Sequence, residues 1–140
     1  MTKFILDTDH FSLFQRRHPI VGRKVAQIAI EDLFLTIVSA EEQVRGRLNV
    51  IRRASSPQNA IIAYQRLRTL LEDLKNVNLL DFTEEAATIY ESLVRQKIRI
   101  GTRDLRIASI ALSINGIVVT RNRRDFEKVP GLNLEDWTRE

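Results

Sequence analysis

The stretch KFILDTDHFS, residues 3–12, decides the fold. Its apolar run, Phe4–Leu6, stops abruptly at Asp7, and a second acid, Asp9, follows two residues later. A short apolar run bounded by polar residues predicts a buried β-strand. A carboxylate at the end of such a strand has two interpretations, a solubilising turn or a metal site at the edge of a sheet, and the rest of the chain decides between them.

Comparable apolar runs recur along the chain and predict further strands at Phe34–Val38, Val77–Leu80, Ile117–Val119 and Leu132–Leu134. These runs are near-continuous rather than alternating, as expected for strands that are covered on both faces. Helical patterns lie between them, and this alternation implies parallel strands joined by right-handed crossovers. The sequence therefore predicts an α/β fold, a three-layer α/β/α sandwich with a central parallel sheet of four or five strands, in a single domain over residues 1–140.

Three of the predicted helices are marked by their first residues. Ser56 is an N-cap before Pro57, Thr83 caps a second helix, and Thr102 opens a third, which Asn115-Gly116 closes. The third helix is apolar around most of its circumference, so we expect it to be the best buried. The first two should present apolar faces made of Ile61, Leu67, Leu71 and Leu74, and of Ala86, Ile89 and Leu93.

Composition excludes several kinds of site. The chain has no cysteine, which excludes disulfides, zinc–thiolate sites and cysteine nucleophiles. Its two histidines are His10, expected at the surface or at a helix start, and His18, and it has no G-x-S-x-G and no glycine-rich phosphate loop. A net charge of +4 and a pI of about 9.8 favour polyanionic partners such as RNA or DNA. We expect no signal peptide and no membrane span, and a cytoplasmic location.

Four carboxylates fall at the edge where parallel sheets bind ligands, outside the carboxyl ends of the strands. They are Asp7 after the first strand, Glu42 after the second, Asp104 near the start of the third helix and Asp125 after Ile117–Val119. Each also has a simpler interpretation. Ser39 and Glu42 match a capping box, which the spacing alone slightly favours over a ligand. Asp104 and Asp125 could oppose a helix dipole, and Asp9 and Asp81 are interpreted as loop acids.

Carboxylates that share one edge repel one another, and a divalent cation removes that penalty. Ligands that offer only oxygen suit Mg²⁺ or Mn²⁺ rather than zinc. Arginines flank the same positions, and we expect Arg99, Arg103 and Arg121 to contact substrate phosphates. An acidic, cation-binding centre ringed by arginines is what phosphodiester cleavage needs.

The stretches FILDTDHFS, SAEEQVRG, DLRIASIAL and VVTRNRRDFEKVPGLNLEDW, taken together and in this order, resemble PIN-domain ribonucleases, specifically VapC-type toxins of bacterial toxin–antitoxin pairs. The resemblance spans nearly the whole chain. It implies a Rossmann-like fold, Mg²⁺-dependent endoribonuclease activity, a homodimer, and inhibition by a cognate antitoxin protein that covers the site.

The same resemblance implies roles for individual residues. Asp7, Glu42, Asp104 and Asp125 match the family's acids, with Thr120 and Asn122 in supporting positions. Asp9 stands where the family often has asparagine. Residues 47–76 match no motif of the family and could form dimer or antitoxin contacts.

Two rival functions remain open at this point. LDTDHF approaches the D-x-D-x-T/V motif of haloacid-dehalogenase-like phosphatases, with Asp7 as nucleophile and Asp9 as acid/base, although Phe11 occupies the Thr/Val position. The other rival is a non-catalytic RNA-binding or protein-interaction module, against which the four acids argue.

Overall fold

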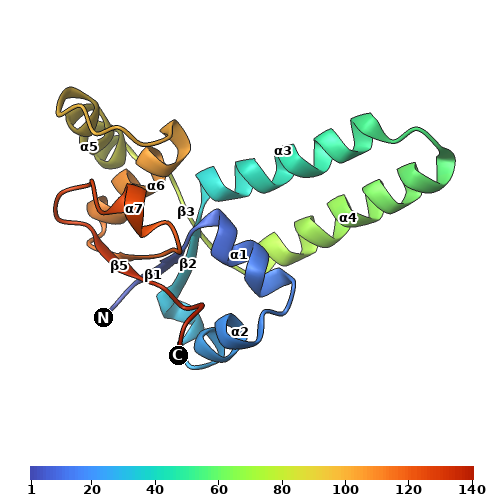
Figure 1. Ribbon diagram of the computed structural model, residues 1–140, viewed down its shortest axis with the longest axis horizontal. Helices are drawn as coiled ribbons and strands as arrows, with labels where there is room; N and C mark the ends of the chain where they lie inside the picture. The colour runs from blue at the N-terminus through green and yellow to red at the C-terminus, as the bar shows by residue number, and fades with distance from the viewer.

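The computed structural model describes residues 1–140 (Figure 1). In chain order its elements are β1 (Phe4–Leu6), α1 (Thr8–Gln15), α2 (Pro19–Ala26), the 3-10 helix η1 (Ile30–Asp32), β2 (Leu33–Thr36), α3 (Ile37–Arg53), α4 (Pro57–Lys75), β3 (Asn78–Leu80), α5 (Glu84–Arg95), α6 (Thr102–Ser113), β4 (Ile117–Val119), α7 (Arg123–Phe126) and β5 (Asn133–Glu135).

The central sheet has five strands in the order β3-β2-β1-β4-β5, and every neighbouring pair is parallel. This confirms the predicted parallel sheet. Strand β1 is central, with Phe4 opposite both Leu33 of β2 and Ile117 of β4. The order of the strands reverses between β1 and β4, and in open parallel sheets ligands bind beside such a switch point, at the carboxyl ends of the strands.

Each face of the sheet has its own hydrophobic core, which confirms the three layers. Ile5 and Val118 belong to a core with side chains of α5 and α6, whereas their neighbours Leu6 and Val119 belong to a core with α1, α2 and Trp137. This division follows from the period of two along a strand. Helix α6 is the best buried, as predicted, with Leu105, Ile107, Ala108, Ser109, Ile110 and Ala111 all buried.

Most of the predicted helix ends are confirmed. The hydroxyls of Ser56 and Thr83 accept the N–H groups of the residues three positions on. After α6, Asn115 adopts a positive φ of 53° and the N–H of Gly116 donates to the carbonyl of Ala111. A Cβ at Gly116 would lie 2.9 Å from Cδ1 of Ile5, so any larger residue in this turn would force the Ile5 side chain to shift.

The second strand ends earlier than the apolar run Phe34–Val38 predicted. Strand β2 stops at Thr36, and the hydroxyl of Thr36 accepts the N–H of Ser39 at 3.1 Å. Ile37 and Val38 are therefore the first residues of α3. The predicted capping box is wrong, because Thr36 and not Ser39 caps this helix. Glu42 therefore does not take part in the cap.

Helices α3 and α4 form a long hairpin that extends away from the sheet (Figure 1). Because much of α4 lies beyond the sheet, its expected apolar face is only partly covered. Ile61 and Leu71 of that face are more than half exposed, and the buried residues of α4 are instead Ala63 and Leu70, which the predicted face did not include. No helix combines the length and the hydropathy that a membrane crossing requires.

Candidate metal centre

Asp7 lies at the switch point of the sheet. Its N–H donates to the carbonyl of Val119 in β4 at 3.0 Å, which continues the β1–β4 ladder past the end of β1. Its carboxylate caps α1, since Oδ1 accepts the N–H of His10 at 2.8 Å. Only 5% of Asp7 is exposed. The abrupt change from an apolar run to an acid thus marks the step from a buried strand into a helix.

The pKa of Asp104 responds to the charges of the other predicted acids. Asp104 lies in the first turn of α6, and its pKa is raised from 3.8 to about 6. Burial is the largest cause, followed by the negative charges of Asp7, Glu42 and Asp125. The structure therefore brings together all four carboxylates, which come from four different parts of the chain. Their role as metal ligands stays a prediction.

Glu42 is oriented by α1. Its Oε1 lies 2.8 Å from Oγ1 of Thr8, and the same hydroxyl lies 2.9 Å from Oγ of Ser39. A carboxylate can only accept, so the Thr8 proton goes to Glu42 and Ser39 donates to Thr8. Sequence reasoning missed Thr8, although a hydroxyl between the two acids of the opening stretch was a visible signal.

Asp125 is held by the residues that follow β4. Thr120 is fully buried, and its hydroxyl accepts the N–H of Asn122 at 2.8 Å. The side-chain amide of Asn122 in turn donates to Oδ2 of Asp125 at 3.1 Å. Asn122 lies at the N-cap position, directly before α7, but its side chain bonds to Asp125 instead of capping the helix.

A second group of possible ligands, Asp7, Asp9 and His10, has ligand atoms within 4.8 Å of one another. Two of its members already have partners. Asp9, which lies in α1 and not in a loop, accepts from Nε and Nη2 of Arg121, both at 2.8 Å, and these hydrogen bonds lower its pKa. His10 accepts the N–H of Trp137 at Nε2. Within this trio, Asp9 is bonded at both oxygens, whereas Nδ1 of His10 has no hydrogen-bond partner.

His10 corrects a second expectation. It lies at the start of α1 as predicted, but it is fully buried rather than at the surface. The main chain of Trp137, 127 residues further on, covers it. No local pattern could have predicted this contact, because it depends on the path of the C-terminal segment.

A polar cleft of about 520 Å³ opens beside these acids and has no hydrophobic residue in its lining. It contains Glu41, Glu42, Arg45, Gly101, Thr102, Arg103, Asp104 and Arg106. Arg103 lies 3.8 Å from Glu42, so one predicted phosphate-binding arginine borders the acids. Arg99 is exposed in the loop before α6, and Arg121 is held by Asp9.

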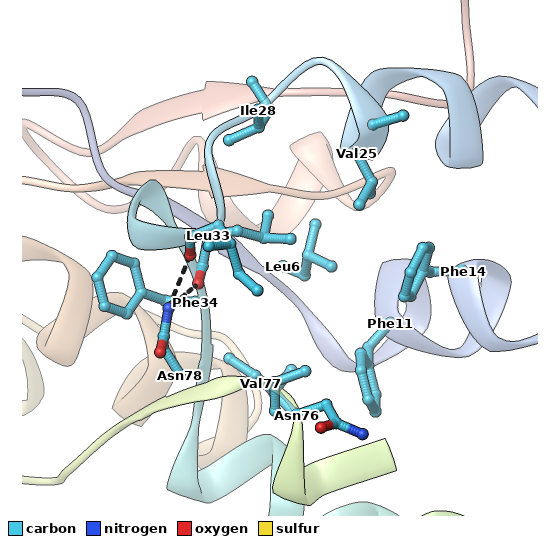
Figure 2. Close-up of a pocket in the computed structure, with 13 residues that line it drawn as sticks. Leu6, Phe11, Phe14, Val25, Ile28, Leu33, Phe34, Asn76, Val77 and Asn78 are labelled. Carbon is cyan, nitrogen blue, oxygen red and sulfur yellow. Dashed lines mark hydrogen bonds between the residues drawn. The ribbon is translucent and has the colours of Figure 1, made fainter.

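A separate cavity is apolar and differs in its lining from the polar cleft. Figure 2 shows this pocket of about 260 Å³, which Phe11 and Phe14 of α1, Val25 of α2 and the start of β2 enclose. The side chain of Asn78 bonds to two main-chain carbonyls at its edge. Eleven of its 13 lining residues are hydrophobic, so it offers no set of charged ligands for metal or phosphate.

The possible ligand atoms of the acidic centre suit a divalent cation. All four groups are carboxylates, which are the ligands that Mg²⁺ and Mn²⁺ prefer. Burial and then the negative charges of the other three acids raise the pKa of Asp104, and a cation between the carboxylates would offset this cost of ionisation.

The chain is similar to known proteins along nearly its whole length. The sequence profile of the PIN domain matches residues 4–132. The ribonuclease VapC1 of Haemophilus influenzae strain R2866 is 28% identical over 142 residues, covering 97% of this chain and 98% of that protein. The tRNA(fMet)-specific endonuclease VapC of Shigella flexneri is also 28% identical, covering 99% of this chain and 100% of that protein.

Solved structures give the same result. VapBC-1 from nontypeable Haemophilus influenzae matches with a TM-score of 0.78 and 26% identity, over 99% of this chain and 100% of that chain. DNA-bound VapBC from Salmonella typhimurium matches with a TM-score of 0.76 and 26% identity, over 98% and 99% of the two chains.

Proposed function

The chain belongs to the PIN-domain family, and from this premise we propose that it is a metal-dependent endoribonuclease that acts as the toxin of a toxin–antitoxin pair. The observation that carries the proposal is the group of four carboxylates beside a polar cleft bordered by arginines, in which burial and then the charges of the other three acids raise the pKa of Asp104. Full-length similarity to two named nucleases supports the substrate class, RNA.

In the proposed centre, Asp7 and Asp104 are the principal ligands of Mg²⁺, or of Mn²⁺, directly or through water. Glu42 and Asp125 complete the acidic set, and one of them orients the attacking water. When bound, the cation polarises the scissile phosphate and lowers the pKa of its water. The chain contributes fixed geometry, because Thr8 holds Glu42 and Asn122 holds Asp125 before substrate arrives.

The arginines bind the RNA backbone in this proposal. Arg103 borders the cleft, while Arg99 and Arg121 lie in the segments that lead into α6 and α7. Contacts with phosphates position the substrate without reading its sequence. The net charge of +4 strengthens such binding at low salt.

The partners of the proposed toxin are a cognate antitoxin and a second copy of the chain. The solved relatives include VapBC toxin–antitoxin assemblies. The α3–α4 hairpin exposes Leu48, Val50, Ile61, Ile62, Tyr64 and Leu71, an apolar surface that a protein partner could cover. An RNA substrate is consistent with a cytoplasmic location of the protein.

The rival functions are less consistent with the site. In a dehalogenase-like phosphatase Asp9 would act as acid/base, but Asp9 is bonded at both oxygens to Arg121. A binding module without catalysis would have no use for four repelling carboxylates beside its arginines.

The decisive experiment measures RNA cleavage by the purified chain with Mg²⁺, for the wild type, Asp7→Asn and Asp104→Asn. Both variants should lose cleavage but remain folded. Asp81→Asn is the matched control, because Asp81 is an exposed loop acid outside the site. Full activity of Asp7→Asn would refute the assignment, and release of phosphate from a monoester instead of cleaved RNA would favour the phosphatase.

A further inference from the structure

We propose that His10 is a positioning residue for the carboxylate of Asp7 and that it couples this carboxylate to the C-terminal segment Glu135–Thr138. The inference rests on the proposed function, because Asp7 is taken there as a metal ligand. It extends to a part of the chain beyond residue 132, where the match to the PIN profile ends.

The hydrogen bonds of His10 determine its tautomer. Nε2 accepts the N–H of Trp137 at 3.2 Å, so this nitrogen carries no proton. Asp136 Oδ1 also lies 3.7 Å from Nε2, but that oxygen already accepts from the N–H and the hydroxyl of Thr138. A neutral ring with its proton on Nδ1 satisfies these contacts.

Nδ1 of His10 lies close to the carboxylate of Asp7. Nδ1 is buried and has no hydrogen bond of ordinary geometry, and it lies 3.4 Å from Oδ1 of Asp7. The backbone N–H of the same histidine donates to this oxygen at 2.8 Å. The backbone N–H of His10 therefore bonds to Oδ1 and its ring faces the same oxygen through an electrostatic contact, which leaves Oδ2 for a ligand. Groups that hold a metal-binding carboxylate in this way tune its affinity for the metal.

The C-terminal segment fixes the plane of the imidazole ring. Trp137 is 3% exposed, and its indole packs against Phe4 of β1 with ring centroids 5.4 Å apart. The indole N–H donates to Oε1 of Glu135 at 2.9 Å. The main chain of Trp137 is thus held at β1 and β5, and through Nε2 it holds the histidine that faces Asp7.

The test measures Mn²⁺ binding by calorimetry and by the paramagnetic resonance signal of free Mn²⁺, without RNA. His10→Leu keeps most of the buried volume but removes both nitrogens, and it should weaken Mn²⁺ binding about tenfold or more. His10→Gln retains one donor and one acceptor, so it should recover part of the loss. Phe4→Leu tests the coupling, because it loosens the packing that holds Trp137 against His10, and it should weaken Mn²⁺ binding less than His10→Leu does. Asp81→Asn is the control, because Asp81 is an exposed loop acid outside the site.

The outcomes separate positioning from general stability. A dissociation constant for Mn²⁺ unchanged in folded His10→Leu would overturn the role of His10, and one unchanged in folded Phe4→Leu would overturn its coupling to the C-terminal segment. If His10→Leu does not fold, His10→Gln is compared with His10→Asn, whose shorter side chain cannot reach both partners, and equal affinities would overturn the proposal. Unchanged Mn²⁺ binding in Asp104→Asn would instead refute the metal centre itself.

Discussion

Replacing Asp104 with asparagine should stabilise the metal-free protein at neutral pH. The folded protein holds this carboxylate in a partly buried site beside three other acids, and its pKa is raised to about 6. In the unfolded chain the same group has its ordinary pKa of 3.8. Ionisation therefore costs more in the folded state, and Asp104→Asn removes that cost.

The pKa difference sets the magnitude and its sign. Between pH 3.8 and about 6 the folded state binds more protons than the unfolded state, so the free energy of unfolding falls as pH rises through this window. The full difference corresponds to about 3 kcal/mol. Because the side chain is in part exposed and screened by solvent, we expect a gain of about 1–2 kcal/mol for Asp104→Asn above the window. The gain should vanish below it.

Urea unfolding in the presence of a chelator measures this difference, at about pH 7.5 and again near pH 4. Adding Mg²⁺ should reverse the order of stability, because the wild type binds the cation and gains stability by mass action, while the variant does not. A variant less stable than the wild type at neutral pH, or a gain that is equal at both pH values, would refute the reasoning that these carboxylates repel one another.

Thr8→Val should reduce RNA cleavage about 10-fold or more with little loss of stability, since it releases the carboxylate of Glu42, and Thr8→Ser should restore the rate. Arg121→Ala should return the lowered pKa of Asp9 towards its ordinary value, seen by NMR titration of the carboxyl carbon. The Asp9–Arg121 pair stabilises the fold at pH values above the ordinary pKa of Asp9, and this stabilisation is lost as pH falls through the lowered pKa of the folded state. Because the pair is exposed to solvent, it contributes about 1 kcal/mol at most. Gly116→Ala should destabilise the protein by about 1–3 kcal/mol in urea unfolding, because its Cβ would lie 2.9 Å from a β1 side chain. Leu71→Glu should lower the mass found by light scattering if the hairpin joins two copies, while leaving Mn²⁺ binding unchanged.

The features that the sequence predicted best are those with local causes. Strands β1 and β4 have the predicted bounds, because each is a short apolar run that a polar residue ends. Helix α6 begins at Thr102 as predicted, and a glycine turn follows it. The start of α3 was wrong because Thr36 and Ser39 are both good caps, and only the register of β2 against β1 decides between them.

The site was predictable as a set of acids but not as a set of contacts. The rule for parallel sheets placed Asp7, Glu42, Asp104 and Asp125 at one edge, and the resemblance to a family matched the same four acids. The hydroxyl that holds Glu42 and the main chain that covers His10 depend on how α1 packs against α3 and against residue 137. Such contacts follow from tertiary packing, which spacing along a chain does not encode.

The order of the acids along the chain has a consequence for synthesis. Asp7 leaves the ribosome long before Asp125, and strand β5, which pairs with β4, follows Asp125 in the sequence. The four carboxylates can therefore meet only after β4 and Asp125 have been translated. The proposed centre cannot bind its cation while only the first half of the fold has been made.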